Sequence, residues 1–184
     1  MSAAVQRQPL ADITGPADLA LWFEVQQFLF LEARLIDDRR FTDWVALFSD
    51  EVRYWMPIVS NRIGRDQGRE LTTRDELSHF EEDKTSLVNR VRRLGTGMAW
   101  AETPPSRTRH LVGNVEVQRT TNADEVAVRS NFVVYRSHLE HDSEFFVGRR
   151  DDRLRREGGA WRIVDRVLLL DQNVVTQKSL GLFL

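Results

Sequence analysis

Apolar residues recur at helical spacing near the start of the chain. Between Leu19 and Ile36 they return every three or four positions, and polar residues such as Glu24 and Gln27 stand between them. This periodicity is typical of a helix with one apolar face. Asp18 lies just before it, and an aspartate at that position can cap the first turn. The pattern therefore predicts an amphipathic helix that begins after Asp18.

Shorter patterns follow this helix. The segment FTDWVALF at residues 41–48 predicts a second, short helix, and EVRYWMPIV at residues 51–59 is typical of a strand. Thr73 and Glu76 have the spacing of a capping box, and apolar residues from Leu77 to Leu94 then line one face of a helix. We therefore expect a third helix over this last stretch.

The second half of the chain is dominated by extended patterns. Four such runs occupy residues 107–119, 125–138, 144–156 and 160–172. Short turn-rich segments join them, and Gly158 with Gly159 can form a tight turn because glycine adopts positive φ at little cost. Sequential antiparallel pairing is the simplest topology. Helices come first and strands later, which predicts an α+β fold with the helices on one face of a curved antiparallel sheet.

Length and composition indicate one folded unit. The chain has 184 residues, and 41% of them are hydrophobic, which suits a single core. We expect one α+β domain over residues 18–184. The segment before it is polar and carries Pro9, Gly15 and Pro16, so we expect residues 1–17 to form a flexible N-terminal arm.

Charge and cysteine content narrow the function. The formal net charge is −2 and the two signs are interspersed, so neither nucleic acid nor an anionic membrane is an expected partner. No apolar run approaches the length of a bilayer span, and the first residues lack the pattern of a secretion signal. The chain has no cysteine, which excludes disulfides, thiol nucleophiles and cysteine-ligated iron–sulfur clusters on this polypeptide. We expect a cytoplasmic protein.

Three blocks carry a resemblance to a known family. They are FLFLEARLIDDRRFTDWVALFSDEVRYWMPI, FEEDKTSLVNRVRRLGTGMAWAETPPSRTRHLVGNVEV and FFVGRRDDRLRREGGAWRIVDRVLLLDQNVV. In order and spacing they resemble the small β subunit of the aromatic-ring-hydroxylating Rieske non-haem iron dioxygenases, in the biphenyl, benzene and toluene dioxygenase branch. The resemblance covers nearly everything after about Leu19.

The resemblance implies a fold, partners and a role. The fold would be a cystatin-like or nuclear-transport-factor-like cone. The partners would be a large α subunit, in an α3β3 hexamer, and other copies of this chain in a trimeric core. The large subunit would carry a Rieske [2Fe–2S] cluster and a mononuclear Fe(II). It would cis-dihydroxylate aromatic hydrocarbons with electrons from NADH.

A Rieske cluster needs two cysteine ligands, which this chain cannot provide. The resemblance therefore implies a structural subunit with no cofactor, metal or catalytic residue of its own. The sequence does not reveal which aromatic compound is the substrate, or which surface faces which subunit.

Two other functions remain open on the residues alone. His110 could serve a freestanding dehydratase or isomerase inside the cone, oriented by Asp37, Asp165 or Tyr54, or it could satisfy a buried hydrogen bond or face a subunit. The chain could also be a homotrimeric scaffold unrelated to oxygenation. The segment HLEHDSE at residues 138–144 contains possible metal ligands, but a turn between two strands is the favoured interpretation.

Three segments are candidate subunit interfaces. One is a strand whose alternating charges fall on both sheet faces, which requires neutralising partners unless the strand is simply solvated. Its candidate contacts are Arg149, Arg150, Asp151, Asp152 and Arg153. The second is Trp100, in a loop between glycines and prolines. The third is the apolar end of the chain with Leu182 and Phe183, which either closes over the core or docks on a neighbour.

Overall fold

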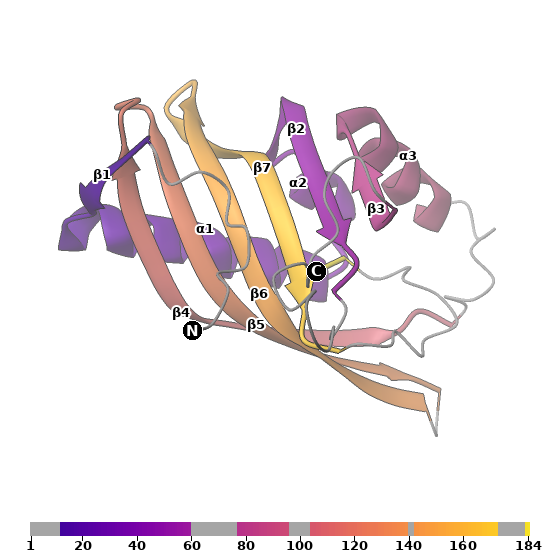
Figure 1. Ribbon diagram of the computed structural model, residues 1–184. Helices are drawn as coiled ribbons and strands as arrows, with labels where there is room; N and C mark the ends of the chain where they lie inside the picture. Colours follow the sequence, from indigo (N-terminus) through magenta and orange to yellow (C-terminus); the bar gives the residue numbers. More distant parts are fainter. Residues whose placement is uncertain (1–11, 60–76, 96–103, 140–141, 173–182) are drawn as a thin grey trace.

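The computed structural model describes residues 12–59, 77–95, 104–139, 142–172 and 183–184 (Figure 1). Its helices are α1 (Leu19–Asp37), α2 (Phe41–Val45) and α3 (Lys84–Gly95). Its strands are β1 (Ile13–Pro16), β2 (Phe48–Pro57), β3 (Ser78–Glu82), β4 (Arg107–Thr120), β5 (Glu125–His138), β6 (Asp142–Glu157) and β7 (Ala160–Leu170). The predicted α+β class is confirmed, with the helices on one face of a curved sheet.

The strands form one sheet in the order β1-β4-β5-β6-β7-β2-β3. Strands β4 to β7 pair sequentially and antiparallel, as the short connections predicted. Strand β2 comes from the first half of the chain and pairs parallel with β7, so it extends the sheet beyond the last strand of this meander. Strand β3 then pairs with the other edge of β2. Figure 1 shows α1 lying across the sheet, with α2 and α3 beside β2 and β3.

Helix α1 begins where its sequence predicts. The Asp18 carboxylate accepts a hydrogen bond from the backbone N–H of Leu21 at 2.9 Å, which caps the first turn. The helix turns Val25, Leu29 and Ile36 inward, all nearly without solvent exposure. This apolar face packs on the concave side of the sheet and forms the main core.

The segment that follows Leu77 does not continue as predicted. The capping residues Thr73 and Glu76 lie outside the described residues, and Ser78–Glu82 forms β3 rather than a helix. Helix α3 starts only at Lys84, after Asp83, whose carboxylate accepts a hydrogen bond from the N–H of Ser86 at 2.8 Å. The helical prediction is wrong for Ser78–Glu82, because apolar residues in this stretch also fit a strand and pairing with β2 decides between the two. It is confirmed from Lys84 to Gly95.

The predicted flexible arm is also wrong from Asp12 onward. Ile13–Pro16 pairs with β4, and the backbone oxygen of Asp12 accepts a hydrogen bond from the N–H of Thr121 at 2.8 Å. The Asp12 carboxylate also binds Arg153 at 2.7 Å. Residues 1–11 lie outside the described part of the chain. The edge of the sheet therefore gains a strand that its polar sequence did not indicate.

Candidate functional site

The concave interior of the sheet holds a group of buried charges. Glu32 comes from α1, Arg150 and Asp152 from β6, and Arg166 from β7. Each is at most 4% exposed. We call these four residues the interior ion network. It contains two carboxylates and two guanidinium groups, so its net charge is zero.

Arg166 is the centre of the interior ion network. Its Nε and Nη2 donate to the two oxygens of Asp152 at 2.7 and 2.9 Å. Its Nη1 and Nη2 donate to the two oxygens of Glu32 at 2.5 and 2.9 Å. Burial opposes the charge of Arg166, but the two carboxylates outweigh it and hold its pKa well above the usual value.

Glu32 is held as a carboxylate by the same contacts. Burial disfavours its ionised form, but Arg166 and Arg150 outweigh that penalty and lower its pKa to about 2. Arg150 reaches Glu32 with Nη1 at 3.2 Å, and the indole N–H of Trp44 donates to the other oxygen at 3.2 Å. A carboxylate with these partners stays ionised near neutral pH, because its pKa lies far below that pH, and it acts as a structural anion.

The interior ion network changes one interface prediction. Arg150 and Asp152 point inward and are buried in their own subunit, so they cannot touch a neighbouring chain. The alternation of charge does place charges on both faces of β6, as the sequence indicated. The inner ones, however, are neutralised by α1 and β7 rather than by a partner.

The outer charges of β6 lie on the face away from α1. Asp151 binds the guanidinium of Arg129 at 2.7 Å and that of Arg149 at 3.4 Å. Arg153 binds Asp12 at 2.7 Å. These side chains are partly exposed, so a neighbouring chain can still reach them. Their role as contacts remains a prediction.

The same outer face carries exposed apolar side chains. Leu111, Val133 and Val147 are cross-strand neighbours on β4, β5 and β6, and Tyr135 pairs with Phe145 one step along. The rings of Tyr135 and Phe145 lie 5.2 Å apart, and Phe145 is 59% exposed. We call these five residues the outer apolar ladder. The sequence signal was FVVY in β5, where apolar residues face both ways, and the sequence reasoning missed it.

His110 lies beside Asp37, which was one of its three predicted orienting groups. Its Nδ1 is 2.6 Å from Asp37 Oδ1, and its Nε2 is 3.1 Å from the backbone oxygen of Phe183. Both neighbours are hydrogen-bond acceptors, so each ring nitrogen of His110 already has a partner. Burial raises the pKa of Asp37, but hydrogen bonds from His110 and Thr108 outweigh burial and lower it.

The other two predicted orienting groups contact different partners. Tyr54 donates its hydroxyl to the backbone oxygen of Leu184 at 2.8 Å. Asp165 lies opposite Arg153 in the sheet, away from His110. The structure therefore shows the buried hydrogen bond that the sequence left open for His110, and His110 ties the end of the chain to the start of β4.

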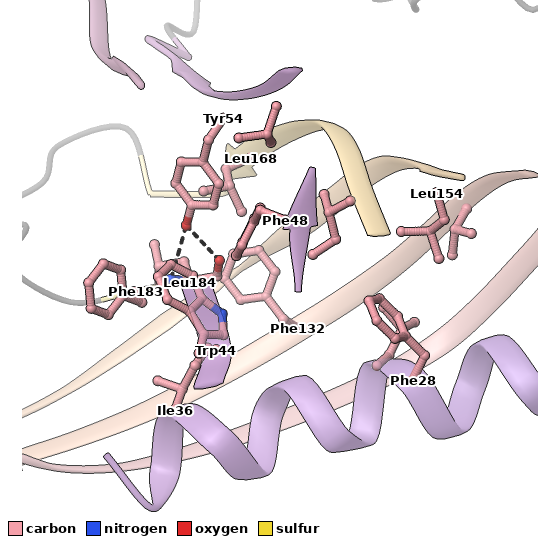
Figure 2. Close-up of a cluster of buried hydrophobic side chains, with 14 of the residues drawn as sticks. Phe28, Ile36, Trp44, Phe48, Tyr54, Phe132, Leu154, Leu168, Phe183 and Leu184 are labelled. Carbon is pink, nitrogen blue, oxygen red and sulfur yellow. Dashed lines mark hydrogen bonds between the residues drawn. The ribbon is translucent and has the colours of Figure 1, made fainter. Parts of the chain in front are cut away.

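The end of the chain closes over its own core. Phe183 and Leu184 are 1% and 2% exposed. The centroids of the Phe183 and Trp44 rings lie 4.2 Å apart. Figure 2 labels both residues, beside Tyr54 and Leu184. This corrects the prediction that Phe183 is an interface residue. Leu182 and Trp100 lie outside the described residues.

The described residues of the segment HLEHDSE lie at the end of β5 and the start of β6. His138 pairs with Asp142, and Glu144 binds Arg136 at 3.2 Å; residues 140–141 are not described. Within the described ranges, no three side chains of His, Asp or Glu are grouped as metal ligands would be. None of the helices in those ranges is long and apolar enough to cross a membrane.

A separate groove of about 540 Å³ lies between the first turn of α1 and the β4–β5 turn. Its charges are paired within the chain, Asp18 with Arg119 and Glu24 with Arg156. None of its lining residues belongs to the group around His110, so the groove has no acid–base pair that fits the predicted alternative activity.

Comparisons with known proteins show which family this sequence resembles. Residues 31–177 match the family described as "Ring hydroxylating beta subunit". The chain is 40% identical over 171 residues to benzene 1,2-dioxygenase subunit beta from Pseudomonas putida, which covers 92% of this chain and 91% of that protein.

Solved structures show the fold. A structure of naphthalene 1,2-dioxygenase with indole bound in its active site matches 95% of this chain and 91% of the compared chain, with a TM-score of 0.81 and 23% identity. A protein from Novosphingobium aromaticivorans, provisionally named a scytalone dehydratase, matches 84% of this chain and 86% of its own with a TM-score of 0.58 and 15% identity. The predicted nuclear-transport-factor-like α+β fold is therefore confirmed. On the family match and the identity to the benzene dioxygenase subunit, this chain belongs to the family of ring-hydroxylating dioxygenase beta subunits.

Proposed function

We propose that this chain is the structural subunit of a multicomponent dioxygenase that cis-dihydroxylates benzene, toluene or biphenyl-type hydrocarbons. The identity to benzene 1,2-dioxygenase subunit beta supports this substrate class. The observation that best supports a structural role is the packing of the concave interior, which the interior ion network, Phe183 and Leu184 occupy. A chain packed in this way contributes architecture, and the chemistry belongs to a partner.

The proposed partner is a large α subunit that carries the metals. A Rieske [2Fe–2S] cluster requires two cysteines, and this chain has none. A mononuclear iron of the two-histidine, one-carboxylate kind does not fit the described residues either, since they bring no such group together. The Rieske cluster and the mononuclear Fe(II), which together supply dioxygen activation, are therefore assigned to the large subunit. The complex would work in the cytoplasm, where NADH is supplied.

The proposed assembly is an α3β3 hexamer around a trimer of this chain. Its contact surface is the outer sheet face, where the outer apolar ladder lies beside the ion pairs of Arg149, Asp151 and Arg153. Exposed aromatic groups next to charges are typical of subunit interfaces. Beside this face, the part of β6 before Gly148 does not pair with β7. Its backbone there is partly covered, because the Gln172 side chain donates a hydrogen bond to the backbone oxygen of Phe145 at 2.6 Å. Contact through the face is therefore favoured over strand addition at the edge.

The alternative function, a freestanding dehydratase or isomerase that uses His110, is not favoured. Both ring nitrogens of His110 already have partners, and the space beside it holds Phe183. A substrate would have to displace that residue before it met the imidazole.

Co-expression tests the proposed function. The tagged chain is produced together with the proposed large subunit, and iron, the Rieske absorption and benzene oxidation with NADH and the electron-transfer proteins are measured. We expect all three signals in the complex and their loss when this chain is omitted. Stoichiometric iron in the isolated chain, or conversion of an organic compound by that chain alone, would refute the proposal.

A further inference from the structure

The last two residues are held as a bound peptide would be. Three of their backbone groups make hydrogen bonds to buried side chains. The oxygen of Phe183 lies 3.1 Å from His110 Nε2. The oxygen of Leu184 accepts from the Tyr54 hydroxyl at 2.8 Å, and the N–H of Leu184 lies 3.3 Å from the same hydroxyl oxygen (Figure 2).

The side chain of Phe183 fits an aromatic box. The ring of Trp44 lies 4.2 Å from it and that of Phe41 lies 5.3 Å from it, both tilted. The guanidinium carbon of Arg90 lies 4.5 Å from the centre of the Phe183 ring. This box favours an aromatic side chain, because Phe41 and Trp44 pack against its ring and the guanidinium of Arg90 lies over the ring face.

The groups that hold the dipeptide are positioned by the rest of the chain. Asp37 fixes the His110 ring at 2.6 Å and also accepts from the His110 backbone N–H at 3.1 Å. The Tyr54 ring stacks on Phe80 with 5.4 Å between centroids, and Trp44 donates to Glu32. None of these supports involves Phe183 or Leu184. Each of these groups therefore has support that does not come from the dipeptide, as the groups of a preorganised ligand site do.

We propose that Phe41, Trp44, Tyr54, Arg90 and His110 form a binding site for an aromatic–aliphatic peptide segment, and that Phe183–Leu184 is its separable ligand. The site then accepts the same segment supplied in trans. Its specificity is for an aromatic residue followed by an aliphatic one, with backbone recognition by His110 and Tyr54. This binding function is independent of the proposed role in oxygenation.

Deletion of Phe183 and Leu184 tests the proposal directly. We expect the truncated chain to melt at a lower temperature than the full chain, and N-acetyl-Phe-Leu to raise that temperature in a saturable way. The full chain should not respond, because its site is filled. N-acetyl-Ala-Ala serves as the control peptide, and calorimetric titration gives the affinity.

A matched variant identifies the pocket. Tyr54→Phe in the truncated chain removes one hydroxyl and leaves the ring on Phe80, so N-acetyl-Phe-Leu should bind about tenfold more weakly, as the loss of hydrogen bonds to a buried backbone implies. Equal affinity in the two chains would overturn the assignment of the site. A folded truncation that ignores the dipeptide, or that melts with the full chain, would overturn the proposal.

Phe183→Ala in the full chain covers the case in which the truncation does not fold. This variant opens a ring-sized apolar space, and benzene should raise its melting temperature but not that of the unmodified chain. Failure of both variants to fold would show that the dipeptide is part of the core and not a separable ligand. Since every readout uses the isolated chain, failure here leaves the proposed dioxygenase role untouched, and the reverse also holds.

Discussion

Arg166 on β7 binds Glu32 on α1 through two hydrogen bonds of 2.5 and 2.9 Å, so the last strand of the meander is tied to the helix that covers it. The same guanidinium holds Asp152 on the neighbouring strand. One buried cation thus fixes three elements. Breaking such a pair is costly, because the remaining charges stay buried without compensation.

Glu32→Gln is therefore expected to destabilise the fold strongly. The change leaves Arg150 and Arg166 with only Asp152 as a counter-charge, and we expect a loss of about 3–5 kcal/mol in the free energy of unfolding. Urea denaturation measures it. Glu24→Gln is the matched control. Glu24 lies on the same helix as Glu32 but forms a half-exposed ion pair with Arg156 of β6, so its loss should matter far less. Equal effects of the two changes would contradict the role of the interior ion network.

The stability difference between these two chains should depend on pH. The pKa of Glu32 is lowered from 4.5 to about 2 in the folded state, so its ionised contacts contribute fully above pH 4.5. As the pH falls from 4.5 to 2 the unfolded state takes up the proton first, and the contribution disappears. The shift corresponds to roughly 3 kcal/mol at 1.36 kcal/mol per unit.

Unfolding curves of the wild type and Glu32→Gln between pH 6 and pH 2 test this. The gap between the two free energies of unfolding should be constant above about pH 5 and should narrow toward pH 2. A gap that stays constant over the whole range would show that folding does not lower the pKa of Glu32.

Gly148→Ala should be poorly tolerated for a steric reason. A Cβ at this position would lie 2.2 Å from the carbonyl oxygen of Leu169 on the adjacent strand. Backbone atoms would have to move, and we expect a loss of at least about 2 kcal/mol. Gly113→Ala in β4 is the control, because a Cβ there meets nothing within 4 Å. Equal urea midpoints for the two variants would rule out this close contact between β6 and β7.

Asp151→Ala and Arg153→Ala test the charged part of the outer face. Both should lower the melting temperature or the fraction of assembled complex, because each removes partners of a partly exposed ion pair. The iron content per assembled complex should not change. Asp43→Ala, which breaks an exposed pair with Arg40, is the control. An unchanged assembly in analytical ultracentrifugation, together with an unchanged melting temperature, would remove these residues from the interface.

Phe145→Ser tests the outer apolar ladder. Since Phe145 is 59% exposed, its loss should leave the isolated chain nearly as stable but weaken assembly about tenfold, as expected for an aromatic contact at an interface. Sedimentation at several concentrations measures the effect. Leu77→Ser is the control because Leu77 is 83% exposed in a different part of the chain. Normal assembly of the Phe145 variant would exclude the outer apolar ladder as a contact.

Local patterns predicted most of the elements but not the contacts between them. The cap at Asp18, the turn at Gly158 and Gly159 and the four strands of the meander are each encoded within a few residues, and the structure has them. Strand β3 was mistaken for helix because its identity depends on pairing with β2. The segment Ile13–Pro16 was missed for the same reason, since its pairing partner is β4.

The candidate site depended even more on distant contacts. Glu32 interrupts an apolar helix face, which is a visible signal, but its two arginine partners lie more than a hundred positions away. Asp37 was named as a partner of His110 on chemistry alone. That Phe183 occupies the other side of the ring could not be read from the sequence, because it depends on where the chain end folds.

The parallel pairing of β2 with β7 has a consequence for biosynthesis. β2 leaves the ribosome early, but its parallel neighbour β7 is the last of the described strands to be made. Until β7 emerges, the edge of β2 that pairs with it and the core surfaces that β7 covers stay open, and non-local pairings of this kind form slowly. The newly made chain therefore passes through a long interval in which chaperones, or the large subunit itself, must shield these surfaces from aggregation.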